Sequence, residues 1–125
     1  MEEEKIKMYC IMAMESMTKM NGIRGKMITQ GGHGYVHAFW DSQKRFPAAA
    51  QAYMDANRAY KITLVVETVE ELKEIEARYR DICGVSLVTD AGFTVFAEPT
   101  TTCLGLGPIF ERDIGDDLKG LRTLT

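Results

Sequence analysis

The sequence predicts an α/β protein: a three-layer α/β/α sandwich around a four-stranded, mostly parallel (mixed) sheet. Apolar, β-rich runs alternate along the chain with segments of helical periodicity. The chain has 125 residues, 46% of them hydrophobic and 26% charged, which suits one globular domain. Because no repeat, low-complexity tract or linker divides the sequence, we expect residues 1–125 to form a single domain.

The first half of the chain predicts two strands and two helices. Lys5–Met14 is an apolar run bounded by charge and predicts a buried strand, followed by a glycine-punctuated loop over Ser16–Gly25. The pattern of Arg24–Lys44 suits a helix that ends shortly before a proline. That proline opens a second, short helix over Pro47–Asn57, and the β-branched residues of Tyr60–Glu67 predict a central strand.

The second half predicts a capped helix and two further strands. Thr68 and Glu71 form a capping box at the start of an amphipathic helix. Val85–Thr89 is expected to be the third strand and Thr102–Leu106 the fourth. The tail from Asp113 is polar, with one short helical possibility. In such folds functional residues gather in loops beyond the carboxyl ends of strands.

Charge is unevenly distributed along the chain. The net charge of −3 argues against a protein that coats itself in nucleic acid. Residues 17–62, however, hold seven basic and two acidic residues, whereas residues 63–125 hold six basic and 12 acidic ones. This segregation indicates an anionic partner, with a chance distribution and a solvated acidic face as the alternative.

The cysteines and the start of the sequence indicate the cellular compartment. Cys10, Cys83 and Cys103 have no paired spacing, which disfavours both a disulfide scaffold and a cysteine-based zinc site. The first residues are acidic, and the apolar run Met8–Met14 is far shorter than the roughly 18 residues that span a bilayer. We therefore expect a cytoplasmic protein with no membrane partner.

One face of the first long helix carries polar residues. Lys26, Gln30, His33 and His37 follow helical spacing. Lysine is disfavoured in a first helical turn, so Lys26 is a candidate functional residue, with an ordinary surface lysine as the alternative. The two histidines lack an evident third ligand, and Gly34 stands where a zincin has glutamate, so no metal site is predicted. A histidine hydrogen-bonded into the structure is the commoner outcome for His33, and simple exposure for His37.

Asp90 is the acidic residue that the sequence singles out. It directly follows an apolar strand and precedes Ala91-Gly92, so its carboxylate is expected to face the crevice at the end of the sheet. The alternative is an Asx-turn aspartate that only caps the turn backbone. Cys103, within a predicted strand and without an adjacent base, is interpreted as a small buried residue and not as a nucleophile.

Taken together, these residues resemble the type 2 peptidyl-tRNA hydrolases over almost the whole chain, from about residue 8 to residue 124. Three motifs carry the resemblance in the family's order: Gly25-Lys26 with Gln30 and His33, then Asp90-Ala91-Gly92-Phe93-Thr94, then Pro99 to Pro108 followed by the tail Leu118 to Leu124. The resemblance implies hydrolysis of the ester between a peptide and the 3′ ribose of tRNA, with no metal or organic cofactor. It also makes a homodimer plausible.

The resemblance assigns roles residue by residue. The implied catalytic residues are Lys26, Asp90, Thr94 and Thr102. Gln30 and His33 match helix positions of the family and are expected to bind substrate. The basic stretch of residues 17–62 is expected to meet the tRNA phosphates, with Lys19, Arg24, Lys44 and Arg45 as its tRNA-binding residues. Asp90 would act either as a base or by electrostatic positioning of water. Phe93 and Glu98 reduce positive charge near the site, which bears on the strength of tRNA binding. The loop between Lys19 and Lys26 is about two residues longer than the common form, and with Phe93 it leaves a catalytically silent tRNA- or protein-binding module of the same fold as the alternative function.

Overall fold

The computed structural model describes residues 4–92 and 96–125 and contains one four-stranded sheet of order β2–β1–β4–β3. The strands are β1 (Ile6–Ala13), β2 (Tyr60–Val66), β3 (Val85–Asp90) and β4 (Thr100–Phe110). Strands β1 and β2 are parallel, whereas β4 runs antiparallel to both β1 and β3. The predicted α/β class and four-stranded mixed sheet are confirmed, but antiparallel pairs outnumber the parallel one. The reason is that residues 91–99 join β3 to β4, too few for the helical crossover between parallel neighbours.

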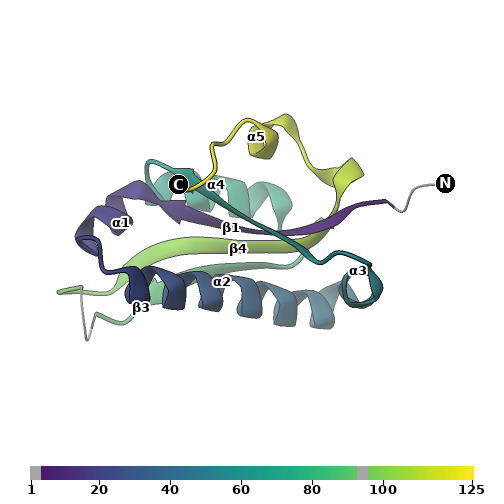
Figure 1. Cartoon of the computed structure of the whole chain (residues 1–125), viewed down its shortest axis with the longest axis horizontal. Helices are drawn as coiled ribbons and strands as arrows, with labels where there is room; N and C mark the ends of the chain where they lie inside the picture. Colours follow the sequence, from purple (N-terminus) through teal and green to yellow (C-terminus); the bar gives the residue numbers. More distant parts are fainter. Residues whose placement is uncertain (1–3, 93–95) are drawn as a thin grey trace.

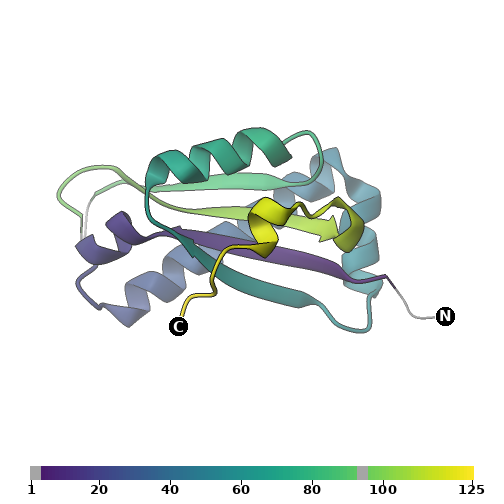
Figure 2. The same ribbon diagram turned by 90° about the horizontal axis from the view of Figure 1, so that it is seen from above.

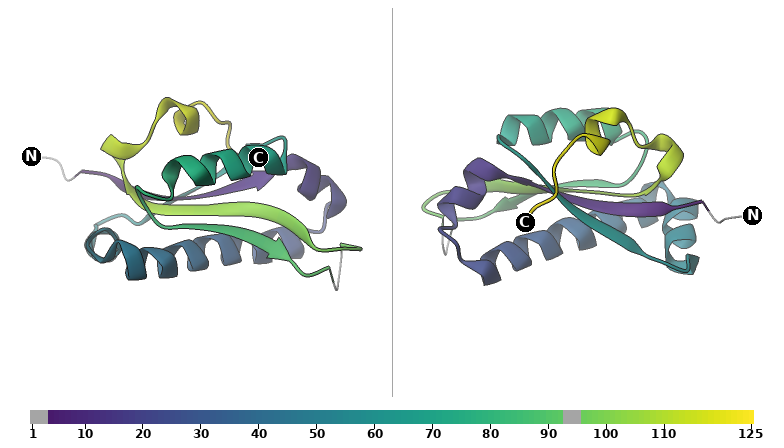
Figure 3. Two further views of the ribbon diagram at one scale, coloured as in Figure 1. Left: turned by 180° about the vertical axis from the view of Figure 1, so that it is seen from behind. Right: turned by 45° about the horizontal axis from the view of Figure 1, so that its top comes forward.

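Helices cover both faces of the sheet, as the three-layer prediction requires (Figure 1). The long helix α2 (Arg24–Arg45) and α3 (Pro47–Asp55) lie on one face. On the other face lie α4 (Val69–Tyr79) and the short α5 (Asp116–Lys119), as both views of Figure 3 show. The predicted cap at the start of α4 is present, since the Thr68 hydroxyl accepts a hydrogen bond from the Glu71 amide at 3.2 Å.

Two elements differ from the prediction. The expected loop over Ser16–Gly25 begins instead with a helix, α1 (Met14–Lys19), because Ser16 and Met17 are buried and the Ser16 hydroxyl donates to the Thr101 carbonyl oxygen at 2.6 Å. Strand β4 extends beyond the predicted bounds Thr102–Leu106 at both ends. The predicted strand was too short because glycines and a proline, which usually mark turns, lie inside β4.

Gly105 explains why a glycine lies in the middle of β4. Helix α2 crosses β4 so closely that a Cβ atom at Gly105 would stand 1.8 Å from the Gly34 carbonyl oxygen. Only a residue without a side chain permits this approach. The face of α2 that carries Gly34 and Ala38 therefore packs on the sheet, where both residues are buried.

The C-terminal segment returns across the sheet to its β2 edge (Figure 2). The Leu124 amide donates to the Thr63 carbonyl oxygen at 3.0 Å, and the Val65 amide donates to the Arg122 carbonyl oxygen at 3.1 Å. Leu64 and Thr123 form an antiparallel bridge between them. Residues 122–124 thus cover part of an otherwise open edge strand.

The last residues of β1 and β3 and the first residues of β4 lie at the same end of the sheet. Because β4 is antiparallel to β1 and β3, its first residues lie beside the last residues of those strands, and Asp90 pairs with Thr100. Helix α1 and the start of α2 lie at this same end of the molecule (Figure 1). Within the described ranges, no helix is both long and apolar enough to cross a membrane.

Candidate active site

An ion pair between Lys26 and Asp90 lies at this end of the sheet, where β3 terminates. Lys26 belongs to the first turn of α2 and Asp90 is the last residue of β3, and the Lys26 ammonium donates to Asp90 Oδ2 at 2.6 Å. The side chains are only 14% and 12% exposed. Partial removal from water strengthens the attraction between the two charges relative to a surface pair. Asp90 thus stands at the end of its strand, as the sequence predicted, and Lys26 contacts it there.

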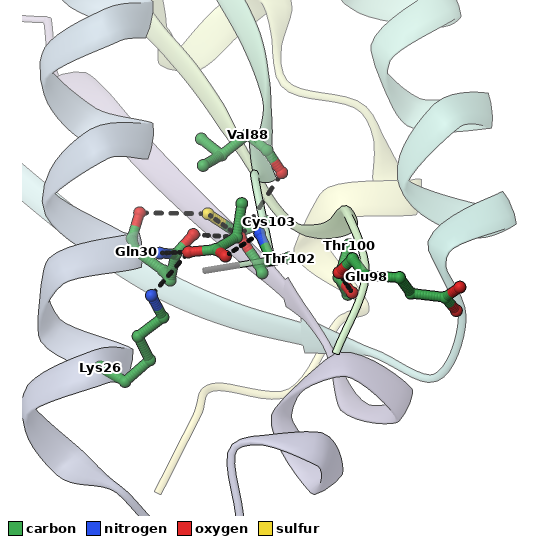
Figure 4. Close-up of polar contacts among 9 residues, drawn as sticks. Lys26, Gln30, Val88, Glu98, Thr100, Thr102 and Cys103 are labelled. Carbon is green, nitrogen blue, oxygen red and sulfur yellow. Dashed lines mark hydrogen bonds and ion pairs between the residues drawn. The ribbon is translucent and has the colours of Figure 1, made fainter. Parts of the chain in front are cut away.

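Gln30 joins the ion pair to the protein interior (Figure 4). It lies one helical turn after Lys26, and its Nε2 donates to Asp90 Oδ2 at 3.2 Å. Its Oε1 accepts a hydrogen bond from the Thr102 hydroxyl at 2.7 Å. An ionised carboxylate can only accept, so the amide nitrogen has to face Asp90 and the amide oxygen has to face Thr102. Four predicted site residues therefore form one hydrogen-bonded cluster.

Asp90 also caps the turn that follows it. Its Oδ1 accepts a hydrogen bond from the Gly92 amide at 2.8 Å, and Gly92 adopts a φ of +88° that glycine reaches without strain. The Asx-turn interpretation and the functional interpretation are thus compatible, because each carboxylate oxygen has its own partners. The Lys26 hydrogen bond, followed by the Gly92 amide, lowers the pKa of Asp90 below its ordinary value. Asp90 is therefore ionised at neutral pH and is a weak base.

A hollow of about 440 Å³ opens beside Asp90. Its walls come from α2 and β3 and consist of Gln30, His33, His37, Leu87, Val88, Thr89, Asp90 and Ala91. Both histidines are exposed, and their ring centroids are 5.4 Å apart. His33 is therefore not the histidine hydrogen-bonded into the structure that the ordinary interpretation expected. The hollow is large enough to admit part of a substrate next to the ion pair.

Two of the predicted catalytic residues are the threonines Thr94 and Thr102. Thr94 and its neighbour Phe93 lie outside the described residues. Thr102 is fully buried, at 0% exposure, and its hydroxyl proton is engaged by Gln30. Because of this burial, Thr102 contacts the ion-paired cluster through Gln30.

The basic residues predicted to bind tRNA fall into two places. Lys19 ends α1 and Arg24 begins α2, and both are exposed at the end of the molecule that holds Lys26. Lys44 and Arg45 lie in the last turn of α2, which at 1.5 Å per residue is about 27 Å along the helix axis from Lys26. The structure therefore brings Lys19 and Arg24, but not Lys44 and Arg45, to the ion-paired end.

Arg45 has structural partners of its own. Its guanidinium donates to the Asp41 carboxylate at 2.6 Å, to the Arg80 carbonyl oxygen at 2.6 Å and to the Cys83 carbonyl oxygen at 3.1 Å. The hydrogen bond from Arg45 is the first cause that lowers the pKa of Asp41. These contacts fasten the C-terminal end of α2 to the segment before β3, which favours a structural role for Arg45.

Sequence reasoning missed one contributor to the cluster, Phe96. The Lys26 ammonium lies 5.8 Å from the centroid of the Phe96 ring, which is 3% exposed. A cation over an aromatic face is attracted by the ring quadrupole. No sequence signal indicates this contact, because Phe96 reaches Lys26 only through the fold.

All three cysteines are free and buried, and the burial of Cys103 agrees with its interpretation as a small buried residue. The Cys103 thiol donates to the main-chain carbonyl oxygen of Gln30 at 3.3 Å. In the part of the chain that the structure describes, no three side chains of His, Cys, Asp or Glu gather as a metal-ligand set.

Comparisons with known proteins agree with the motifs. A family model described as "Peptidyl-tRNA hydrolase PTH2" matches residues 6–124. A peptidyl-tRNA hydrolase of Methanococcus vannielii is 33% identical over 105 residues, covering 81% of this chain and 87% of the relative. Those of Thermococcus onnurineus and Methanocaldococcus jannaschii are 34% and 31% identical, over 78% and 68% of this chain and 81% and 74% of the relatives. Because the family model covers nearly the whole chain, the protein belongs to the peptidyl-tRNA hydrolase PTH2 family.

Proposed function

We propose that the cluster of Lys26, Asp90, Gln30 and Thr102 is where this PTH2-family protein hydrolyses peptidyl-tRNA. The observation that carries the proposal is the 2.6 Å ion pair between Lys26 and Asp90 beside an open hollow. A charged pair that is largely removed from water yet borders a crevice is typical of active sites. Its residues are also those on which the family resemblance rests.

The reaction requires a water molecule, an oxyanion partner and a proton for the leaving group. The water oxygen attacks the ester carbonyl carbon, the bond to the 3′ oxygen of the ribose breaks, and a proton from the water ends on that oxygen. The products are the peptide carboxylic acid and free tRNA. We assign the Lys26 ammonium to the negative charge that develops on the carbonyl oxygen.

Asp90 is assigned to orient the water. Its lowered pKa leaves little driving force for removing a proton from water at neutral pH. As a carboxylate it can still accept a hydrogen bond from the attacking water, while Gln30 and Lys26 hold Oδ2 in place. Of the two roles that the sequence left open, electrostatic positioning is therefore the one we propose.

Binding of the tRNA is assigned to basic residues near the ion pair. Lys19 and Arg24 are exposed at that end of the molecule and are free to meet phosphates, with His33 at the wall of the hollow. Lys44 extends the basic surface along α2. Contacts of this kind weaken as salt rises, because phosphate binding releases counterions. We also propose that the protein acts in the cytoplasm, because a substrate of this class belongs to translation, and a homodimer is compatible with the proposal.

The deciding experiment is hydrolysis of an N-acetylated aminoacyl-tRNA. The wild-type protein is expected to release free tRNA, and Lys26→Ala and Asp90→Asn are expected to lower kcat/KM by about 100-fold or more, the usual effect of losing a charge-stabilising group. Lys73→Ala is the matched control, since Lys73 is an exposed lysine of α4 on the opposite face of the sheet.

Two results would overturn the assignment. Full turnover in Asp90→Asn would show that the Asp90 carboxylate takes no part in hydrolysis. A tight complex of the wild-type protein with the substrate, without release of tRNA, would instead support the catalytically silent binding module.

A further inference from the structure

Three rings follow one another along the exposed flank of α2. The His33 and His37 ring centroids are 5.4 Å apart, and the His37 and Trp40 centroids are 5.2 Å apart with an angle of 22° between the ring planes. All three side chains are exposed, and Trp40 is 54% exposed. We call His33, His37 and Trp40 the ring row.

The ring row begins at the candidate active site. His33 and His37 line the hollow that also contains Asp90, and Trp40 lies one turn beyond it. Counted from Lys26, the three residues stand at i+7, i+11 and i+14, so all share the helical face of Lys26. Lys44, at i+18, continues the same face. The flank therefore carries, in order, the ion-paired ammonium of Lys26, three exposed rings and the exposed ammonium of Lys44.

This order of groups fits unpaired RNA. Proteins bind single-stranded nucleic acid by stacking bases on aromatic rings next to cations that meet the phosphates. The residues Arg24–Arg45 include four basic residues and one acidic residue, Asp41, which is bonded to Arg45, although the whole chain has a net charge of −3. The ring row is thus an aromatic surface on the most positive helix.

We propose that the ring row stacks against the unpaired nucleotides at the 3′ end of the tRNA and so delivers the ester to Lys26 and Asp90. The proposal rests on the proposed function, because that function places a single-stranded 3′ end at this hollow. It adds His37 and Trp40 to the substrate-binding residues, which neither the motifs nor the comparisons single out.

A second copy of the chain is the competing occupant. Trp40 also borders an apolar groove of about 430 Å³ between α2 and α3, with Val36 and Met54 exposed in it. The two histidines decide between the occupants, because they line the polar hollow and not the apolar groove. A dimer through the groove would leave the histidine rings unused.

Trp40 provides its own probe, since it is the single tryptophan of the chain. Titration with a short single-stranded RNA that carries the tRNA 3′-terminal sequence is expected to quench its fluorescence, and the same sequence paired in a duplex is expected to quench far less. In the hydrolysis assay, Trp40→Ala and His37→Ala are each expected to raise KM about tenfold with little change in kcat, the size of effect that losing one stacked base produces. Trp40→Phe keeps a ring and is expected to restore most of the affinity.

Ile82→Ala is the matched control, because Ile82 is an apolar residue, 44% exposed, that borders neither the hollow nor the ring row. Absence of quenching by the RNA, or an unchanged KM in both variants, overturns the proposal while leaving the hydrolase function standing. It is equally overturned if Trp40 fluorescence follows protein concentration and Trp40→Ala turns a dimer into a monomer in sedimentation. If the wild-type protein fails to hydrolyse the substrate, the proposed function fails, and the quenching experiment still decides whether the ring row binds RNA.

Discussion

The hydroxyl of Thr102 donates a hydrogen bond to the side-chain carbonyl oxygen of Gln30 at 2.7 Å, and both side chains are buried. The two residues are 72 positions apart in the sequence and meet because α2 packs on β4. This contact determines which end of the Gln30 amide faces Asp90. A buried residue thus controls the orientation of a group at the edge of the hollow.

Replacing Thr102 tests this control. Thr102→Val removes the donor and leaves Gln30 Oε1 buried without a partner, so we expect a loss of about 1–3 kcal/mol in the free energy of unfolding. Because the amide is then free to turn away from Asp90, kcat should fall roughly tenfold while KM changes little. Thr102→Ser restores the hydroxyl and should recover both quantities. Steady-state kinetics and denaturant unfolding measure them, and an unchanged kcat in Thr102→Val would contradict the positioning role.

The lowered pKa of Asp90 predicts a specific acid sensitivity. A carboxyl group whose pKa is lower in the folded state stabilises the protein above its ordinary value of 3.8. That stabilisation is lost as the pH falls through the folded value, because protonation breaks the ion pair with Lys26. The stability difference between wild type and Asp90→Asn should therefore be largest near neutral pH and shrink below about pH 4. Denaturant unfolding at a series of pH values checks this, and a difference that stayed constant into strong acid would show that the ion pair contributes nothing.

Two glycines should respond to alanine in opposite directions. A Cβ atom at Gly32, on the exposed face of α2, meets nothing within 4 Å, so Gly32→Ala should raise the free energy of unfolding by about 1 kcal/mol through helix propensity alone. Gly105→Ala would place its Cβ atom 1.8 Å from the Gly34 carbonyl oxygen, so α2 would have to move off the sheet. We expect Gly105→Ala to cost several kcal/mol, more than a typical core substitution, or to prevent folding. Thermal unfolding of the two variants side by side distinguishes the effect of helix propensity at Gly32 from the effect of close packing at Gly105 on stability.

Lys44 and Arg45, in the last turn of α2, are expected to have different roles: Lys44 contacts tRNA, and Arg45 stabilises the fold. Lys44→Ala removes an exposed charge and should leave stability unchanged while it reduces the salt dependence of tRNA binding by about one unit of slope. Arg45→Ala removes the link from α2 to the Arg80 and Cys83 carbonyl oxygens and should lower the free energy of unfolding by roughly 1 kcal/mol, because the guanidinium is partly exposed. Binding measured at several salt concentrations, together with unfolding, checks the pair. Equal stability of the two variants would show that the Arg45 contacts are not structural.

The sequence predicted what depends on local pattern. The helical stripe placed Lys26 and Gln30 on one face, and the strand-then-glycine pattern placed Asp90 at the end of the sheet, as the structure shows. It could not predict that Thr102 bonds Gln30, because that contact depends on how β4 lies beneath α2. The long β4 was missed for a related reason: Gly105 signals a turn locally, whereas tertiary packing makes it a strand residue.

Residues 122–124 have a consequence for how separate molecules behave toward one another. By occupying the Thr63 carbonyl oxygen and the Val65 amide, they fill hydrogen-bonding groups of β2 that would otherwise be open to a strand from another molecule. Loosening this segment would turn the outer side of β2 into a template on which further strands could add, the first step of β-aggregation. The pairing of residues 122–124 with β2 is therefore also expected to hinder aggregation at high protein concentration.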